Sequence, residues 1–250
     1  MHHKNDFTIM SLNVWYGELL GELLAYITSK KDSVSAFCFQ ETDHATLQAL
    51  DELLGQDFAR HHMHKNAAGE PEQFYVATYI RHGIPVTSTT NLLEDIPKAG
   101  AGLVCELQLS PGKALRLVNV HGQPQPGHKL DTPERIAQSQ SLLRSAAHDD
   151  TPTVFVGDFN LLPEAHSVQL FSAAGYRNLI DDYSIATTRN ELAWQRYPDN
   201  KQLHADYAFT RLNNLFNYDF SVDDVPVSDH LPLMLTLRHA PPLHHVRVLE

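Results

Sequence analysis

The first third of the chain combines strand-like and helix-like hydrophobic patterns in regular succession. Apolar and polar residues alternate from Phe7 to Val14, which is typical of a half-buried β-strand. The apolar residues that follow are spaced three and four apart, as on one face of a helix, and the same strand-and-helix pair then recurs. The pattern predicts strands over Phe7–Val14 and Val34–Phe39, with helices through Leu19–Ile27 and Leu47–Leu54, the second ended by Gly55.

Between residues 58 and 121 the pattern changes to strand-length apolar runs divided by Gly and Pro, which we expect to pair antiparallel. Beyond them, Asp131 or Thr132 can cap a helix with Pro133 in its first turn and with Ile136, Leu142 and Leu143 on its buried side. The other predicted elements are strands Phe58–His64, Phe74–Arg81, Gly102–Leu109, Ala114–His121, Thr153–Val156, Ala205–Thr210 and Leu231–Leu237, and a helix from about Glu164 to Ala174.

This order of elements predicts an α/β fold in which two sheets pack face to face and the helices lie outside them. The sequence shows no internal repeat, low-complexity segment or linker, and its 250 residues suit one hydrophobic core. We therefore expect a single domain over residues 1–250, with its core at about 7–238. Pro241 and Pro242, followed by His244 and His245, are typical of a short surface tail.

Composition narrows the possible classes of protein. With 42% apolar and 20% charged residues, the chain is globular and is not a disordered, fibrous or coiled-coil protein. There are 19 basic and 30 acidic residues, a net charge of −11, which argues against binding nucleic acid by bulk electrostatics. A polyanionic substrate would have to be met by a metal or by a local cationic patch.

The sequence also indicates a compartment. Cys38 and Cys105 lie inside apolar runs, which favours a reducing environment. A single disulfide bridge between them remains an alternative. The N-terminus has no signal-peptide apolar region, and no stretch approaches the ~18 apolar residues of a membrane span. We expect a cytoplasmic protein with no membrane partner, and the sequence indicates no protein partner.

Candidate chemistry comes from polar residues that interrupt or follow the apolar strands. Strand ends converge at a sheet edge, so these residues can line one pocket although they are distant in sequence. Carboxylate and amide oxygens suit a hard cation such as Mg²⁺ or Mn²⁺, and histidines add proton transfer near neutral pH. That combination is typical of phosphoester hydrolysis. The set is Asn13, Glu41, His121, Asp158, Asn160, Asp206, Asp229 and His230.

Each of these motifs also has a purely structural interpretation. Gly157 to Asn160 could be a turn with an Asx cap, and Ser228 to His230 could be a strand-entry turn. Glu41 alone could be a carboxylate at the start of a helix. Their joint order along one chain favours a site, because independent turns have no reason to carry this set of residue types.

The joint pattern resembles a known family. The segments SLNVWYG, FCFQET, VNVHG, VFVGDFN, HADYAF and VSDHLP are similar to the ordered motifs of the endonuclease/exonuclease/phosphatase superfamily, whose members resemble pancreatic deoxyribonuclease. The resemblance runs from about residue 7 to 238, and GDFN and SDHLP are its most specific parts. It implies a four-layered αββα sandwich of two mixed sheets, with a divalent metal, usually Mg²⁺ (or Mn²⁺), at the sheet ends.

The resemblance also implies a role for each matched residue. Glu41 would be the principal metal ligand, assisted by Asn13 and Asp229, and Asn13 could instead contact the substrate phosphate. Asp158 would orient the attacking water. Asn160 would hold the substrate phosphate, His230 would contact the scissile phosphate with Asp206 orienting it, and His121 would act as acid or transition-state stabiliser.

The sequence motifs say less about the substrate than about the reaction. Inositol polyphosphate 5-phosphatases carry a Pro-x-Trp-Cys-Asp-Arg motif where this chain reads Leu203 to Tyr207, so that branch is disfavoured. We expect a metal-dependent phosphodiesterase or nuclease acting on a phosphoester substrate, with nucleic acid among the candidates. A phosphomonoesterase or a lipid-headgroup phosphodiesterase with the same site is the alternative. A non-catalytic binding protein is disfavoured, because every matched position holds a competent residue.

Two segments are candidates for substrate contact outside the motifs. One is the Gly/Pro-rich stretch Gly122–Lys129, and the other is Thr187–Tyr197, where Arg189 and Arg196 could bind phosphate. Aromatic residues of the second segment, Trp194 and Tyr197, could stack on a base or pack over the edge of the core. His61, His62 and His64 alternate on a predicted strand, so a zinc site is conceivable there, but the sequence neighbourhood offers no confirmed third ligand.

Overall fold

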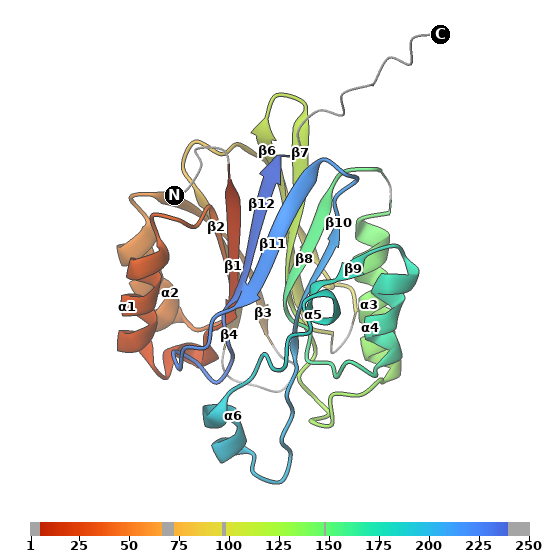
Figure 1. Ribbon diagram of the computed structural model, residues 1–250. Helices are drawn as coiled ribbons and strands as arrows, with labels where there is room; N and C mark the ends of the chain where they lie inside the picture. The colour runs from red at the N-terminus through yellow and green to blue at the C-terminus, as the bar shows by residue number, and fades with distance from the viewer. Residues whose placement is uncertain (1–5, 67–72, 97–98, 148, 240–250) are drawn as a thin grey trace.

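The computed structural model describes residues 6–66, 73–96, 99–147 and 149–239. The predicted surface tail at 241–245 lies outside these residues. Two six-stranded sheets pack face to face with helices on their outer sides, so the predicted αββα sandwich is confirmed (Figure 1). No helix in the described ranges is both long and apolar enough to cross a membrane.

The first sheet has the strand order β11-β12-β1-β2-β4-β3 and is antiparallel except where β1 pairs with β2. Because parallel neighbours need a crossover connection, a helix leads from β1 to β2 on the outer face. The bounds are β1 Phe7–Asn13, β2 Ala36–Thr42, β3 Phe58–Asn66, β4 Gln73–Arg81, β11 Phe216–Val222, β12 Leu233–His239, α1 Leu20–Lys30 and α2 His44–Leu54.

The second sheet repeats this plan with the order β5-β6-β7-β8-β10-β9, and its one parallel pair is β7–β8. Helix α3 makes the corresponding crossover from β7 to β8. The bounds are β5 Val86–Leu92, β6 Ala101–Ser110, β7 Lys113–His121, β8 Thr153–Asp158, β9 Arg177–Asn178, β10 Asp206–Arg211, α3 Pro133–Ser145, α4 His166–Ala173, α5 Leu179–Asp182 and α6 Glu191–Arg196, with a short 3₁₀ turn at Trp15–Gly17 in the first sheet's β1–α1 connection.

All the predicted strands and helices are present, with ends shifted by a few residues, and the predicted antiparallel pairing of 58–121 is confirmed. This stretch is nevertheless divided between the two sheets, with β3 and β4 in the first and β5, β6 and β7 in the second. Strands β5, β9 and β11 and helices α5 and α6 were not predicted. The interior of β5 is exposed, so it lacks the apolar alternation that marks a half-buried strand.

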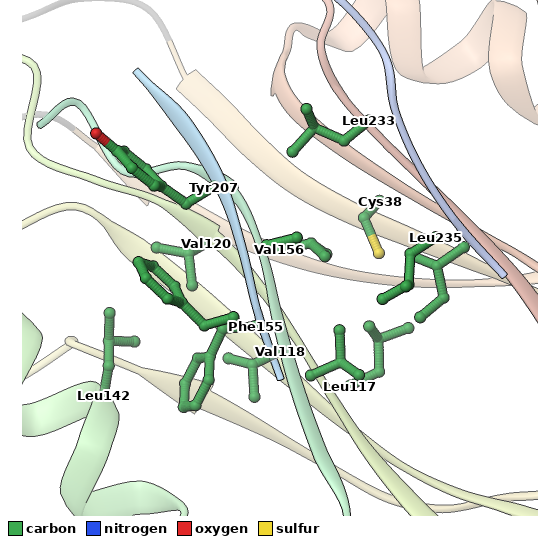
Figure 2. Packing of buried hydrophobic residues seen from close by; sticks show 14 of the residues in the cluster. Cys38, Leu117, Val118, Val120, Leu142, Phe155, Val156, Tyr207, Leu233 and Leu235 are labelled. Atoms are coloured by element: carbon green, nitrogen blue, oxygen red, sulfur yellow. The ribbon is translucent and has the colours of Figure 1, made fainter. Parts of the chain in front are cut away.

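The main core lies between the sheets, and a second apolar layer lies under α1 and α2. Figure 2 shows Cys38 and Leu235 of the first sheet facing Leu117 and Val156 of the second. On the other side of β2, Phe37 and neighbouring apolar residues pack against the helices. Both cysteines are buried with free thiols, which agrees with the absence of a disulfide framework.

Helix α3 differs from its prediction, because its buried side is largely polar. Thr132 is its cap, accepting from the Arg135 amide, whereas Asp131 instead accepts from the His166 and Ser167 amides at the start of α4. Ile136 and Leu143 are only half buried, while Arg135, Gln138 and Ser139 are fully buried together with Leu142.

Arg135 is buried because it holds the loop after β7. Its guanidinium donates to the carbonyl oxygens of Leu130 (2.6 Å), Pro126 (2.7 Å), Gln123 (3.1 and 3.3 Å) and Pro124 (3.2 Å). One side chain therefore donates to four carbonyls of this Gly/Pro-rich loop, which cannot satisfy them within a regular element.

We expect Arg135→Met to lower the free energy of unfolding by about 3 kcal/mol, because the loop after β7 would lose the hydrogen bonds that attach it to a fully buried side chain of α3. Urea denaturation measures this. The matched control is Arg144→Met on the exposed side of the same helix, which should change stability by about 0.5 kcal/mol or less. An equal loss in both variants would contradict the role given to Arg135.

Candidate active site

Strand register brings three ionisable side chains into one row across the second sheet. His121 at the end of β7 is the register partner of Asp158 at the end of β8, and Asp158 is in turn the partner of Asp206 at the start of β10. Register partners on neighbouring strands point to the same face. Here that face is the interior of the sandwich, where all three side chains are buried.

The first sheet supplies Asn13 and Glu41 from the ends of its parallel pair. Asn13 is the register partner of Gln40. Between Phe39 and Thr42 the β2–β4 register shifts, and Glu41 in this irregularity has a left-handed φ of 53°. A bulge re-aims a side chain, and strained non-glycine residues concentrate at functional sites. The site therefore lies at the carboxyl ends of both parallel pairs, β1–β2 and β7–β8.

Hydrogen bonds across the interior tie the two halves together. The Asn13 side-chain amide donates to Asp158 Oδ2 at 2.9 Å, and the Asn13 Oδ1 accepts from the Trp15 amide at 3.0 Å. Deeper between the sheets, Gln40 Nε2 donates to Asn119 Oδ1 at 2.7 Å, and the Asn119 amide donates to backbone oxygens of β2 and β4. These bonds fix the spacing of the sheets next to the site.

Glycine allows the chain to pass closely behind Asp158. Gly157 has φ +138°, and a Cβ on it would come within 1.9 Å of the Val120 carbonyl oxygen. A Cβ on Gly122 would come within 2.0 Å of the Phe159 carbonyl oxygen. The Gly122 amide donates to the Asp158 carbonyl at 2.6 Å, so the loops after β7 and β8 are held together at the site.

His230 is the imidazole at the centre of the carboxylates. Its Nδ1 lies 2.9 Å from both oxygens of Asp206, and its Nε2 lies 3.7 Å from Asp158 Oδ2 and 3.8 Å from Asp229 Oδ1. Burial, and next the charge of Arg189, would lower the pKa of His230. The carboxylates of Asp206, Asp229 and Asp158 outweigh both and raise it, which favours the charged imidazolium.

Glu41 and His121 form the second part of the site. Glu41 Oε1 lies 3.4 Å from His121 Nε2, which has no hydrogen-bond partner among the described residues. Burial alone would raise the pKa of Glu41, but the His121 contact, with help from His230 and Asn13, lowers it to about 2. Burial also opposes ionisation of Asp158, yet His230, Lys129 and His121 lower its pKa below the usual value. Both carboxylates are therefore ionised at neutral pH.

Within the described part of the chain, two groups of side chains could hold a cation, and Asp158 belongs to both. Potential ligand atoms of Glu41, His121 and Asp158 all lie within 4.8 Å of one another, as do those of Asp158, Asp206 and His230. The first group fits a hard divalent cation, since it combines two ionised carboxylates with a buried imidazole nitrogen that lacks a partner. Asp229 belongs to neither group, and its Oδ2 accepts from Arg189 Nη2 at 2.8 Å.

Asn160 is joined to a lysine from the loop after β7. The Asn160 amide hydrogen-bonds the Asp158 carboxylate at 2.8 Å, and its side-chain amide donates to the Gly122 carbonyl at 2.9 Å. Lys129 Nζ donates to Asn160 Oδ1 and lies in the field of Asp158 and Glu41. Partial burial nevertheless lowers the pKa of Lys129. The candidate stretch Gly122–Lys129 thus contributes one cation to the site.

The second candidate stretch, Thr187–Tyr197, lies next to Asp206, Asp229 and His230. Thr188 Oγ1 accepts from the amides of Ala205 and Asp206, and the Arg189 backbone bridges to His230. Buried Arg189 makes the ion pair with Asp229, while exposed Arg196 lies over the Trp15 ring at 5.2 Å. The segment therefore positions Asp206 and Asp229, in addition to any contact with substrate.

Sequence reasoning did not single out Lys129, Thr188 or Trp15. Lys129 lies 31 residues from Asn160, and no local pattern marks such a contact. Trp15 lies two residues after Asn13 in the segment SLNVWYG, and this proximity was the available signal. Of the three histidines considered for zinc, His62 and His64 pack against the Tyr75 ring, and no cation-binding group among the described residues includes them.

Comparisons with known proteins agree with this geometry. The endonuclease/exonuclease/phosphatase from Bacteroides vulgatus superposes with a TM-score of 0.72 at 16% identity, over 95% of this chain and 100% of that chain. Truncated Caenorhabditis elegans TDP2 superposes with a TM-score of 0.67 at 18% identity, over 93% of this chain and 98% of that chain. The human Nocturnin catalytic domain with bound sulfate gives 0.70 at 16% identity, over 94% of each chain.

At these identities the solved structures show a shared fold, and a search of curated proteins finds no match. The sequence itself matches the Endonuclease/Exonuclease/phosphatase family over residues 10–230, a range that includes every residue of the site from Asn13 to His230. The chain therefore belongs to the endonuclease/exonuclease/phosphatase family.

Proposed function

We propose that this protein is a divalent-metal-dependent hydrolase of phosphodiester bonds, with nuclease activity as its leading form. The observation that carries the proposal is the position of Asp158 between two groups of side chains. On one side Glu41 and His121 can hold a cation, and on the other Asp206 and His230 form a hydrogen-bonded pair. A phosphate bound beside Asp158 would meet both.

Mg²⁺ or Mn²⁺ is the expected cation, held by Glu41 with Asp158 and His121 close by and with Asn13 assisting. Asp229, the other ligand expected from the sequence, lies outside this group and is paired with Arg189. Bound at Glu41, the cation would polarise the phosphoryl oxygen and offset charge developed in the transition state. Asp158, ionised and hydrogen-bonded by Asn13, is suited to orient an attacking water. The side chain of Asn160 and the ammonium of Lys129 are suited to hold the phosphate oxygens.

His230 is suited to bind the scissile phosphate as an imidazolium. Asp206 fixes the ring through Nδ1, which leaves Nε2 pointing toward Asp158 and Asp229. His121 can supply a proton to the leaving group or stabilise charge near the cation. A phosphomonoesterase or a lipid-headgroup phosphodiesterase would use the same groups, so a metal-dependent screen over single- and double-stranded DNA, RNA, dinucleotides and phosphomonoesters tests the choice.

The first prediction concerns the metal. Glu41→Ala should weaken binding of Mg²⁺ or Mn²⁺ by about tenfold or more, because a charged oxygen ligand is lost from a site with few others. Isothermal titration calorimetry measures this, and Glu52→Ala, which removes an exposed carboxylate on α2, is the control. Equal affinity in wild type and Glu41→Ala would refute the assignment of Glu41.

A second prediction concerns turnover. Asp158→Asn and His230→Ala should each lower kcat by about a hundredfold or more, since both groups act on charge and geometry that develop in the transition state. The double variant should fall well short of the product of the two effects. Asp32→Asn, at an exposed position, is the control. Near wild-type kcat in a folded single variant would show that its residue has another role.

The third prediction tests the Asp206–His230 pair. Asp206→Asn removes a charge that raises the pKa of His230, so the pKa should fall, as NMR titration of the metal-free protein would show. If the imidazolium is the active form, the alkaline limb of the pH–rate profile should move to lower pH. An unchanged His230 pKa would exclude the electrostatic role of Asp206, and a lowered pKa with an unchanged profile would exclude His230 as the group behind that limb.

A further inference from the structure

A polypeptide arm, residues 186–204 including α6, crosses the site from one side to the other. Near its start, Asn190 Nδ2 donates to the Ser228 carbonyl at 2.7 Å, next to Asp229. Near its end, Gln202 Nε2 donates to the Gly127 carbonyl at 2.8 Å, in the loop that carries Lys129. Between these anchors α6 stands out beyond the strand ends (Figure 1). The arm thus lies beside the strand ends and loops that carry Asp229 and Lys129.

An aromatic and cationic cluster joins this arm to the connection between β1 and α1. The Arg196 guanidinium lies 5.2 Å from the centre of the Trp15 ring and 5.7 Å from that of Tyr197. Tyr197 is 51% exposed. Trp194, by contrast, is used within the arm, because its Nε1 donates to the Gln202 carbonyl and Lys201 lies over its ring. Among the described residues of this cluster, Trp15, Arg196 and Tyr197 are therefore the group with aromatic and cationic surface left for a ligand.

Trp15 is held beside the catalytic groups in a strained conformation. Its amide donates to Asn13 Oδ1, and Asn13 in turn contacts Asp158. Trp15 and Tyr16 both have left-handed φ values, 49° and 51°, which are outliers for bulky residues. Such strain persists where the surroundings over-determine it and is a reason to look for a function of the ring.

The N–H groups at the edge of the Arg196 guanidinium are available to bind an anion. Rings lie beside the guanidinium, and no hydrogen bond or ion pair of Arg196 is present among the described residues. The arm's acidic residues, Glu191 and Asp199, are likewise exposed, so its charge is mixed. In a chain with a net charge of −11, an unpaired exposed arginine beside the site is nonetheless a local cationic point for a polyanion.

We propose that Trp15, Arg196 and Tyr197 form a nucleotide subsite that selects single-stranded nucleic acid. A base next to the scissile phosphate would stack on this aromatic surface, and the Arg196 edge would bind a neighbouring phosphate. Only an unpaired base can offer its face in this way, because the bases of a duplex are already stacked. This inference rests on the proposed phosphodiesterase function and names the substrate class of the same site.

Two diesters with the same leaving group test the subsite. The substrates are thymidine p-nitrophenyl phosphate, as its 3′ or 5′ isomer, and methyl p-nitrophenyl phosphate. In each, water adds to phosphorus and the bond between phosphorus and the p-nitrophenolate oxygen breaks. The products are thymidylate or methyl phosphate and p-nitrophenolate. Wild type should favour at least one thymidine isomer by about tenfold in kcat/KM, as base stacking typically contributes.

The preference should fall to near unity in Trp15→Ala and in Arg196→Gln. The exposed position of Arg196 makes loss of folding an implausible cause in the second variant. Arg177→Gln, which removes an exposed charge near the far end of β10, is the matched control and should keep the preference. Equal kcat/KM for all three diesters in wild type, or a preference retained in both site variants, would overturn the subsite while the phosphodiesterase function stands.

If none of the diesters is hydrolysed, that result counts against the proposed function, and a binding measurement then tests the subsite. The chain has two tryptophans, so Trp194→Phe leaves Trp15 as the sole tryptophan fluorophore. A short oligothymidylate should quench it, and an abasic oligomer of equal charge should not. Quenching by neither or by both equally would overturn the subsite. Preference for duplex over single-stranded DNA would overturn it as well.

Discussion

Mutual repulsion of buried carboxylates is the constraint around which this site is built. Asp158, Asp206 and Asp229 are almost inaccessible to water, and Glu41 is largely so. Ionised together without partners they would be too costly to bury. The countercharges come from separate segments, namely Lys129, Arg189 and His230. This explains why the loops that carry these residues must be held in place.

The same two-residue alternation that builds the core also positions the site. Along β1, Phe7 and Ile9 belong to the inter-sheet core, and the residues that follow on the same face are Ser11 and then Asn13. Along β7, Leu115 and Leu117 lead in the same way to Asn119 and His121. Polarity thus increases toward the carboxyl ends of both parallel pairs, and the core continues into the site without a change of backbone geometry.

This continuity explains what the sequence predicts and what it does not. The apolar runs reveal the strands, and polar residues such as Asp158 at their ends reveal the candidate site, because both follow from local periodicity. The buried Arg135 of α3 and the contact between Lys129 and Asn160 depend on partners in distant loops. Edge strand β5 and the arm around α6 bury too little apolar surface to produce a periodic pattern.

In the proposed function, chemistry and substrate choice fall to different parts of the fold. Asn13, Asp158 and Asp206 lie on strands whose spacing is fixed by bonds between the sheets, such as Gln40 to Asn119. The α6 arm is attached to that frame at its two ends and contributes no ligand to the cation-binding groups of the described residues. Its exposed tip can change in sequence without disturbing the carboxylates, whereas Thr188 and Arg189 at its base cannot, because they hold Asp206 and Asp229 in place.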